Sequence, residues 1–193
     1  MSSRDELLAR LRAQRVEPVP LPALSGDWIT YPDREAQFRA ALARAAGSVV
    51  VAPEGDVRLA VGRLGVVQQA ARFCSLVAAV PGNLPCPSEP AGFAEVEVLL
   101  CQAEFGVAEN GAVWLDERVA PLRAGLFLTQ HLVLLLERAA LVDHMHAAYA
   151  RLGARVGQTG YGCFLCGPSK TADIEQALIV GAHGARSLVV VLY

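Results

Sequence analysis

The sequence predicts an α/β fold in which helices cover a buried, mainly parallel sheet. Of its 193 residues, 53% are hydrophobic and 19% are charged, enough apolar material to cover strands on both faces. From residue 31 onward, apolar runs of strand length alternate with helical patterns, and the chain ends on a strand, a turn, a helix and a strand. Such a βαβ unit is parallel and right-handed. The length fits one domain with a short appendage.

The first 30 residues are predicted to form an arm outside this domain. Residues 3–15 carry three leucines at helical spacing with arginines opposite, which predicts an amphipathic helix. Residues 16–22 contain three prolines and are therefore expected to be an extended linker. We expect an arm over residues 1–30 that docks on the body or on a partner, and a single domain over 31–193.

The first half of the body begins with a capped helix. Asp33 can accept a hydrogen bond from the first turn of a helix that runs to Ala46, and Gly47 then ends it. The further elements expected are a strand over 48–52, a stretch over 57–73 that is mostly helical in its second half, a strand over 75–80 and a loop over 81–92.

The second half of the body is predicted around a hairpin. The pair Asn110-Gly111 lies between two apolar stretches, and Asn-Gly is a strong signal for a tight hairpin turn. The further elements expected are a buried strand over 131–136, a helix over 141–152, a glycine-rich connection over 153–162, and strand, helix and strand over 163–166, 172–182 and 187–193.

Composition excludes several classes of function. The net charge of −2 gives no basic surface for nucleic acid, and no apolar run reaches the length of a membrane-spanning helix. The N-terminus lacks the apolar stretch of a secretory signal, and the five cysteines are odd in number and scattered. We therefore expect a cytoplasmic protein with reduced cysteines.

No metal site is predicted. Cys163 and Cys166 have CxxC spacing, but no second pair completes a four-ligand set, so buried small residues of a core strand are the preferred interpretation. His144 and His146 are two apart on the expected helix and should diverge.

The segment from Gly167 to Thr171 is the main candidate binding site. If it joins a strand to a helix, its free backbone N–H groups and the helix dipole suit an anion, with Lys170, the only lysine of the chain, as a steadying cation. A Schiff-base role for this lysine is conceivable. The alternative is ordinary capping, with Ser169 or Thr171 as the cap and Asp173 complementing the dipole.

Three stretches together resemble the LutC/YkgG family of lactate-utilisation proteins, which carry the LUD domain. They are Glu104 to Ala112, similar to the family's IAETGT hairpin; Thr129 to Leu132, similar to THI; and Gly167 to Leu188, similar to GPSRTADIE and GVHGPRSL. The chain departs from the pattern at Asn110 and Ala112, where the family has threonines, and at Lys170, where arginine is commoner. An arginine there argues against imine chemistry.

The resemblance implies a three-layer, Rossmann-like fold of the NagB/RpiA/CoA-transferase type, with a mixed, mainly parallel sheet and a β-hairpin. It also implies a role in oxidising L-lactate to pyruvate together with LutA-like and LutB-like partners. The iron–sulfur clusters would belong to those partners, and this chain would carry no cofactor but would bind a small organic anion. The candidate ligand-binding residues are Gly167, Ser169, Lys170, Thr171, Asp173, His131 and His183.

Two other functions remain open at this point, and the sequence leaves undecided whether the chain is an enzyme. By analogy of fold, it could be an autonomous CoA-transferase or a formyltetrahydrofolate cyclo-ligase-like enzyme. Glu104 or Glu109 would then be the candidate catalytic nucleophile. Alternatively, it could be a ligand-sensing regulatory module. No nucleophile-elbow motif supports a hydrolase.

Overall fold

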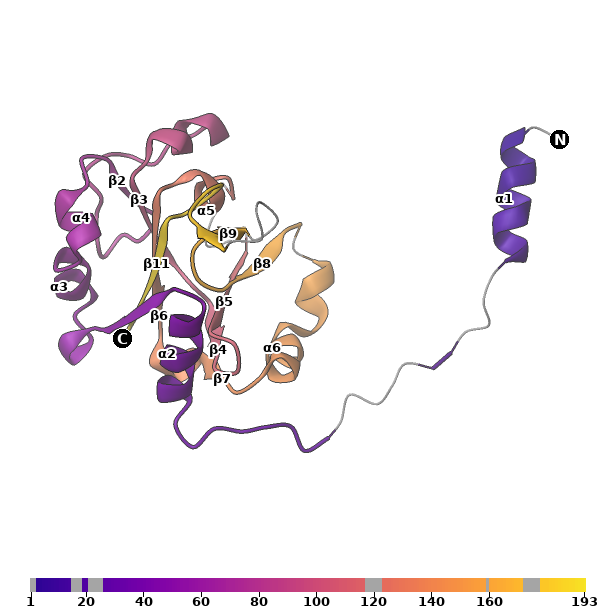
Figure 1. Cartoon of the computed structure of the whole chain (residues 1–193), viewed down its shortest axis with the longest axis horizontal. Helices are drawn as coiled ribbons and strands as arrows, with labels where there is room; N and C mark the ends of the chain where they lie inside the picture. Colours follow the sequence, from indigo (N-terminus) through magenta and orange to yellow (C-terminus); the bar gives the residue numbers. More distant parts are fainter. Residues whose placement is uncertain (1–2, 15–18, 21–25, 117–122, 159, 172–177) are drawn as a thin grey trace.

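The computed structural model describes residues 3–14, 19–20, 26–116, 123–158, 160–171 and 178–193, and its centre is a five-stranded parallel sheet (Figure 1). The strands lie in the order β1-β11-β6-β3-β2, and every neighbouring pair is parallel. Their bounds are Ser48–Val51 for β1, Phe73–Ser75 for β2, Val98–Gln102 for β3, His131–Leu136 for β6 and Ser187–Leu192 for β11.

Two smaller sheets accompany the parallel one. The first is four-stranded, in the order β7-β4-β5-β8, with β5 antiparallel to both of its neighbours and β7 parallel to β4. The second pairs β9 with β10. The bounds are Phe105–Val107 for β4, Ala112–Asp116 for β5, Leu141–Val142 for β7, Gly162–Leu165 for β8, Lys170–Thr171 for β9 and Ile179–Val180 for β10.

Helices and the mixed sheet cover the two faces of the parallel sheet. Alternate residues of β6 belong to different cores: Leu134 packs in one and Val133 in the other, as strand geometry requires. The core of Val133 includes residues of α3 (Val57–Gly62) and α4 (Gly65–Gln69). The core of Leu134 includes residues of α2 (Arg34–Arg44), the mixed sheet and α6 (Met145–Leu152). Figure 1 shows these layers, and the predicted α/β fold with a mainly parallel sheet and a hairpin is confirmed.

The remaining helical elements are short. They are α5 (Gly125–Leu128) and the 3-10 turns η1 (Pro53–Gly55), η2 (Pro90–Glu95), η3 (Arg138–Ala140) and η4 (Gly153–Gly157). None of the helices in the described ranges is both long and apolar enough to cross a membrane.

The predicted helix that follows Asp33 is confirmed. The Asp33 carboxylate accepts a hydrogen bond from the backbone N–H of Ala36 at 2.9 Å and so caps α2. Phe38 and Leu42 are fully buried on the inner face of this helix. Ala46 then adopts a positive φ of 64°, and β1 begins two residues later.

The predicted hairpin between β4 and β5 is also confirmed. Gly111 has a φ of +76°, and the side-chain oxygen of Asn110 accepts a hydrogen bond from the N–H of Ala112 at 3.0 Å. A Cβ at Gly111 would lie 2.5 Å from the backbone nitrogen of Leu42. The glycine is therefore needed both for the turn and for the close approach of the hairpin to α2.

Two elements lie elsewhere than predicted. The strand expected over 75–80 is instead β2 at Phe73–Ser75, because Phe73 hydrogen-bonds Asn83 of the following loop and pairs with β3, while the chain turns after Ser75. The helix expected from residue 141 begins at Met145, since Leu141–Val142 is a strand beside β4.

The expectation that all cysteines are reduced is wrong for one pair. Cys74, the buried middle residue of β2, forms a disulfide with Cys86 in the loop that follows. Cys101, Cys163 and Cys166 are free. The spacing of 12 residues gave no sign of this pairing; the turn after β2 brings the loop back against the strand.

The closing βαβ unit was predicted wrongly. Residues 172–177 lie outside the described ranges, but Ile179–Val180 is a strand, antiparallel to Lys170–Thr171, where a helix was expected. The preceding strand β8 belongs to the mixed sheet and runs antiparallel to β5, so it is not a parallel neighbour of β11.

The N-terminal arm contains the predicted helix. This helix, α1, spans Ser3–Ala13, has no buried residue and stands apart from the body (Figure 1). Most of the expected linker over 16–22 lies outside the described residues. Contact with the body is seen at Trp28, whose ring stacks on that of His146 at 3.6 Å between centroids. The boundary between residues 30 and 31 stays a prediction.

A candidate anion pocket beside Lys170

A pocket of about 320 Å³ lies between α5, the end of β8 and the segment that leads into β11. Its lining contains four of the predicted ligand residues, namely Gly167, Ser169, Lys170 and His183. Its apolar wall includes Leu126, Phe127 and Phe164. The folded chain thus brings together residues that the sequence places 16 positions apart, one of them the only lysine.

The turn that forms one side of the pocket is shaped by tertiary contacts. Gly167 has a φ of +73°, and a Cβ there would collide with the backbone oxygen of Ala45. The N–H of Ser169 donates to the backbone oxygen of Ala185 at 2.9 Å, and the oxygen of Ser169 accepts from the N–H of Gly181 at 2.7 Å. The N–H of Ser169 is therefore already engaged, and Lys170, expected at a helix start, begins a strand.

Lys170 is positioned by the end of another helix. Its Nζ donates a hydrogen bond to the backbone oxygen of Ala45 at 2.7 Å, and Ala45 is the C-terminal cap of α2. Carbonyl groups at a helix C-terminus lack partners within the helix and carry partial negative charge, so a lysine is stabilising there. An ammonium group has three donors, which leaves two for a ligand in the pocket.

The pocket lies at the amino ends of the parallel strands. Leu132, at the start of β6, and Ala185, two residues before β11, both line it. In open α/β sheets, ligands usually bind at the carboxyl edge of the strands. That rule does not apply to β8, because this strand lies in the mixed sheet.

Two predicted ligand residues lie outside the pocket lining. The Nδ1 atom of His131 lies 2.8 Å from the hydroxyl of Ser187, its register partner on β11. His131 and Leu132 are adjacent on β6, so their side chains point to opposite faces, and only Leu132 faces the pocket. Burial, with a smaller effect of Arg186, lowers the pKa of His131. Thr171 is in β9 next to Lys170, and Asp173 lies outside the described residues.

The two candidate glutamates are engaged elsewhere. Glu104 forms an ion pair with Arg155 at 2.5 Å. The Glu109 carboxylate accepts a hydrogen bond from the N–H of Met145 at 3.0 Å, at the first residue of α6. Neither glutamate is part of the pocket lining. In this arrangement Glu109 stabilises a helix N-terminus.

Cys166 is a pocket residue that the sequence analysis assigned to the core. Its thiol donates to the backbone oxygen of Asn110 at 3.1 Å. Burial raises its pKa, and the nearby charge of Lys170 opposes this increase. Burial likewise raises the pKa of Cys163, and it raises that of Cys101 to about 12. These thiols are therefore poor nucleophiles near neutral pH. The apolar wall residues had no signal in the sequence beyond their hydrophobicity.

The other histidines do not form a metal site. The rings of His144 and His146 lie 5.8 Å apart, against Trp28, and so do not diverge as the helical spacing predicted, because His144 caps α6 and lies outside its regular turns. Within the described ranges, no group of three or more histidine, cysteine, aspartate or glutamate side chains is placed to hold a metal ion.

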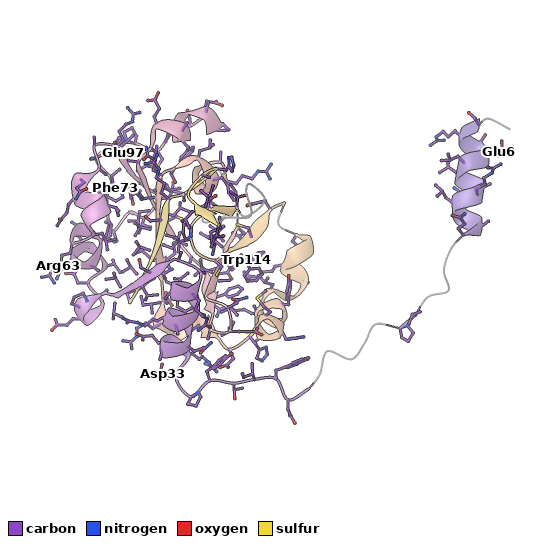
Figure 2. The ribbon with its side chains drawn as sticks, in the orientation of Figure 1. Glu6, Asp33, Arg63, Phe73, Glu97 and Trp114 are labelled. Carbon is purple, nitrogen blue, oxygen red and sulfur yellow. A yellow bond between two sulfur atoms is a disulfide. The ribbon has the colours of Figure 1, made fainter. Side chains whose placement is uncertain are left out.

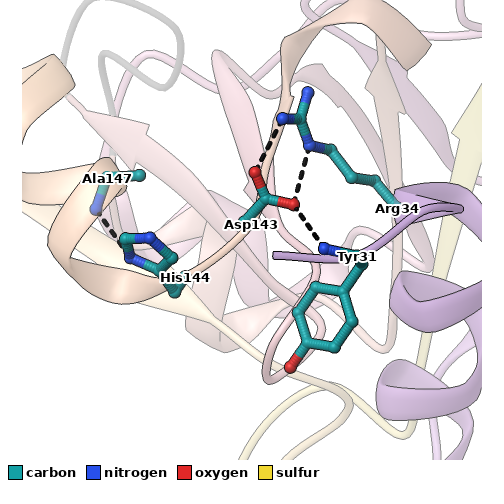
Figure 3. A network of polar contacts seen from close by, with 5 residues as sticks. All are labelled: Tyr31, Arg34, Asp143, His144 and Ala147. Atoms are coloured by element: carbon teal, nitrogen blue, oxygen red, sulfur yellow. Dashed lines mark hydrogen bonds and ion pairs between the residues drawn. The ribbon is translucent and has the colours of Figure 1, made fainter. Parts of the chain in front are cut away.

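Asp143, which lies just before α6, hydrogen-bonds to residues at the start of α2 and just before it. Asp143 is 7% exposed, and its carboxylate accepts hydrogen bonds from Nε and Nη2 of Arg34 at 2.9 and 2.6 Å and from the N–H of Tyr31 at 3.0 Å (Figure 3). The bonds from Arg34 lower the pKa of Asp143. Figure 3 also shows the neighbouring hydrogen bond from the N–H of Ala147 to His144.

Comparison with known proteins assigns the family. The LUD domain model matches residues 91–193, more than half of the chain. Lactate utilization protein C of Bacillus pumilus is 34% identical over 42% of this chain and 36% of its own length, and that of Geobacillus kaustophilus is 32% identical over 47% and 39%. The uncharacterized protein YkgG of Escherichia coli is 28% identical over 81% of this chain and 68% of its own length.

A solved structure supports the fold. The crystal structure of a DUF162 family protein from Deinococcus radiodurans superposes with a TM-score of 0.62 at 15% identity, covering 85% of this chain and 98% of that one. The matches to lactate utilization protein C span less than two fifths of the length of those proteins. The match of the family model covers the pocket-lining turn, and this chain belongs to the LUD domain family.

Proposed function

We propose that this chain is a subunit of an iron–sulfur-dependent system that oxidises L-lactate to pyruvate, and that it binds a small organic anion in the Lys170 pocket. The similarity to proteins named lactate utilization protein C supports the pathway. The main observation in favour of the ligand site is that Lys170 and His183 line the same pocket of about 320 Å³. The clusters would reside on LutA-like and LutB-like partners.

The pocket has the two kinds of surface that a short hydroxy or oxo acid needs. Lys170 supplies a positive charge and donors for a carboxylate, and His183 adds a second polar group. Leu126 and Phe127 provide an apolar wall for a methyl group. The volume lies at the lower end of the range of small-molecule sites, about 300–1,000 Å³, so a compact ligand is favoured.

A binding experiment tests this site. Isothermal titration of the full chain with L-lactate, pyruvate and inorganic phosphate should give saturable binding of at least one anion. Lys170→Met should weaken that binding about tenfold or more, because it removes a charge-assisted hydrogen bond, and Lys170→Arg should retain most of it.

Arg63→Ala is the matched control, since Arg63 is an exposed cation on the far side of the body (Figure 2). It should leave anion binding unchanged. Equal binding by wild type and Lys170→Met, or an equal loss in Arg63→Ala, would show that the pocket is not the site.

The proposed place in a complex has its own test. The tagged full chain, expressed with LutA-like and LutB-like iron–sulfur proteins, should purify together with them, and the complex should oxidise L-lactate. The isolated chain should not. Lactate oxidation by the pure chain would contradict the assignment of the redox chemistry to partners.

The alternative of an autonomous CoA-transferase or formyltetrahydrofolate cyclo-ligase gains no support from the positions of the glutamates. A nucleophile must reach the reacting atom, but Glu104 is paired with Arg155 and Glu109 with the start of α6. A ligand-sensing module would share the pocket, and it would show anion binding without the partners described above.

A further inference from the structure

One buried polar group of the mixed sheet has no partner. Trp114 is 7% exposed, and within the described part of the chain its Nε1 is the buried side-chain nitrogen or oxygen left without a hydrogen bond. A buried tryptophan N–H normally finds an acceptor, because leaving it unpaired forfeits its hydration. The unpaired indole therefore calls for an acceptor that the described residues do not supply.

The indole cannot easily turn towards a partner elsewhere. Trp114 lies in a row with Phe105 and Phe164, its register partners on β4 and β8, so all three rings are on one face of the mixed sheet. The ring centroids of Trp114 and Phe164 are 4.7 Å apart. The six-membered ring of the indole occupies the space over Gly162, where any Cβ would collide with it. This packing fixes the direction of the N–H.

The surroundings provide a positive charge and aromatic walls. On α6, the guanidinium of Arg151 lies 5.1 Å from the centroid of the Phe105 ring, and Tyr149 packs edge-on to Phe164 at 5.9 Å. Arg151 makes no ion pair with any residue in the described ranges. The neighbouring Arg155, by contrast, is paired with Glu104 at 2.5 Å. No carboxylate among the described residues therefore compensates the charge of Arg151, whose guanidinium lies over Phe105, the register neighbour of Trp114.

We propose that Trp114 and Arg151 form a second binding site, for a small organic carboxylate, on the α6 side of the mixed sheet. The indole N–H donates to one oxygen of the ligand, and the guanidinium of Arg151 balances the negative charge. A carboxylate satisfies both groups, since it accepts hydrogen bonds and carries the opposite charge. Trp114 lies beside β8, where Phe164 is its register partner (Figure 2). Trp114 and Arg151 do not line the Lys170 pocket; Phe164 is the residue that the two sites share.

The indole N–H itself provides the readout. The chain has two tryptophans, so a ¹H–¹⁵N spectrum contains two indole signals, and Trp28→Phe identifies that of Trp114. Titration of the full chain with acetate, pyruvate and phenylacetate should shift the Trp114 signal saturably for at least one carboxylate. The Trp28 signal should stay in place. Chloride at the same ionic strength should move neither.

Variants separate this site from the Lys170 pocket. Arg151→Gln should weaken the saturable shift about tenfold or more, because it removes the charge that faces the carboxylate. Lys170→Met should leave the shift unchanged, and Arg63→Ala should also have no effect. If Lys170→Met abolished the shift, the ligand would be that of the Lys170 pocket and the second site would be disproved.

Two further outcomes overturn the proposal without any variant. A Trp114 signal that no carboxylate moves would show that a water molecule, or a neighbouring ring, serves as the acceptor. If Arg151→Gln is folded by circular dichroism and the ligand shifts its Trp114 signal with the same affinity as in wild type, Arg151 is not part of the site. Failure of anion binding at Lys170 would affect neither result, so the two sites are tested independently.

Discussion

The ammonium group of Lys170 and the backbone oxygen of Ala45 are joined by a hydrogen bond of 2.7 Å across 125 residues of sequence. This bond connects the pocket-lining turn to the C-terminus of α2, the first helix of the body. The Lys170 side chain therefore caps the C-terminus of α2 and also presents hydrogen-bond donors to the pocket. Its structural and binding contributions have to be measured separately.

Replacing Lys170 by methionine should lower the free energy of unfolding by about 1 kcal/mol, the usual net contribution of a solvent-accessible hydrogen bond. Urea denaturation monitored by circular dichroism measures the change. Arg63→Ala, which removes an exposed cation at the C-terminal cap of α3 without a described partner, should change stability by less than about 0.5 kcal/mol. If Lys170→Met were as stable as wild type, the bond to Ala45 would not contribute in solution.

Replacing Gly167 by alanine should destabilise the protein severely, by about 3 kcal/mol or more, since the new Cβ collides with the Ala45 oxygen and the φ of +73° is unfavourable for alanine. Gly153→Ala is the matched control. Gly153 has a φ of +51° and a ψ of −134°, but no atom lies within 4 Å of the new Cβ, so only the backbone cost of about 1–3 kcal/mol is expected. Thermal denaturation of both variants compares them; similar melting temperatures would mean that the contact with α2 is not tight.

Replacing Asp143 by asparagine should cost about 2 kcal/mol at pH 7, because the bidentate bonds from Arg34 depend on the negative charge. The pKa of Asp143 is lowered in the folded protein from its ordinary value of 3.8. A lowered folded pKa gives stability that is present above pH 3.8 and is lost as the pH falls through the folded pKa.

The difference between wild type and Asp143→Asn should therefore shrink as the pH falls below 3.8. Urea denaturation over a series of pH values follows this difference. Asp27→Asn, which changes an exposed carboxylate in the same part of the chain, should show neither the loss at pH 7 nor the pH dependence. A difference that stayed constant across the series would assign the effect to packing, not to charge.

Breaking the Cys74–Cys86 disulfide should destabilise the oxidised protein by about 3 kcal/mol, the cost expected for a closed loop of this length. Cys86→Ser and wild type treated with dithiothreitol should show the same reduced stability. Thiol titration of the denatured chain should find three free thiols before reduction and five after it. Five thiols in the untreated protein would show that the pair is reduced in solution.

The elements that could be predicted correctly are those whose signals are local in the sequence. The cap at Asp33, the Asn110-Gly111 turn and the apolar run of β6 each depend on residues within a few positions of one another. The α/β class follows from the same signals, because helices and buried strands in alternation have few ways to cover one another. The resemblance carried by the Gly167 segment likewise needed only a contiguous stretch of sequence, and the match to the LUD domain bore it out.

Where those elements meet depends on contacts between residues far apart in the sequence. Whether β8 joins the parallel sheet or pairs with β5 depends on distant residues, and so does the pairing of Ile179–Val180 with Lys170–Thr171 in place of a helix. The pocket follows from these choices. Lys170 and His183 converge because one turn packs on α2 and the other leads into β11, and His131 is excluded because neighbouring strand residues face opposite sides of the sheet. Sequence periodicity fixes which side of an element is buried; only packing against distant elements fixes what that side contacts.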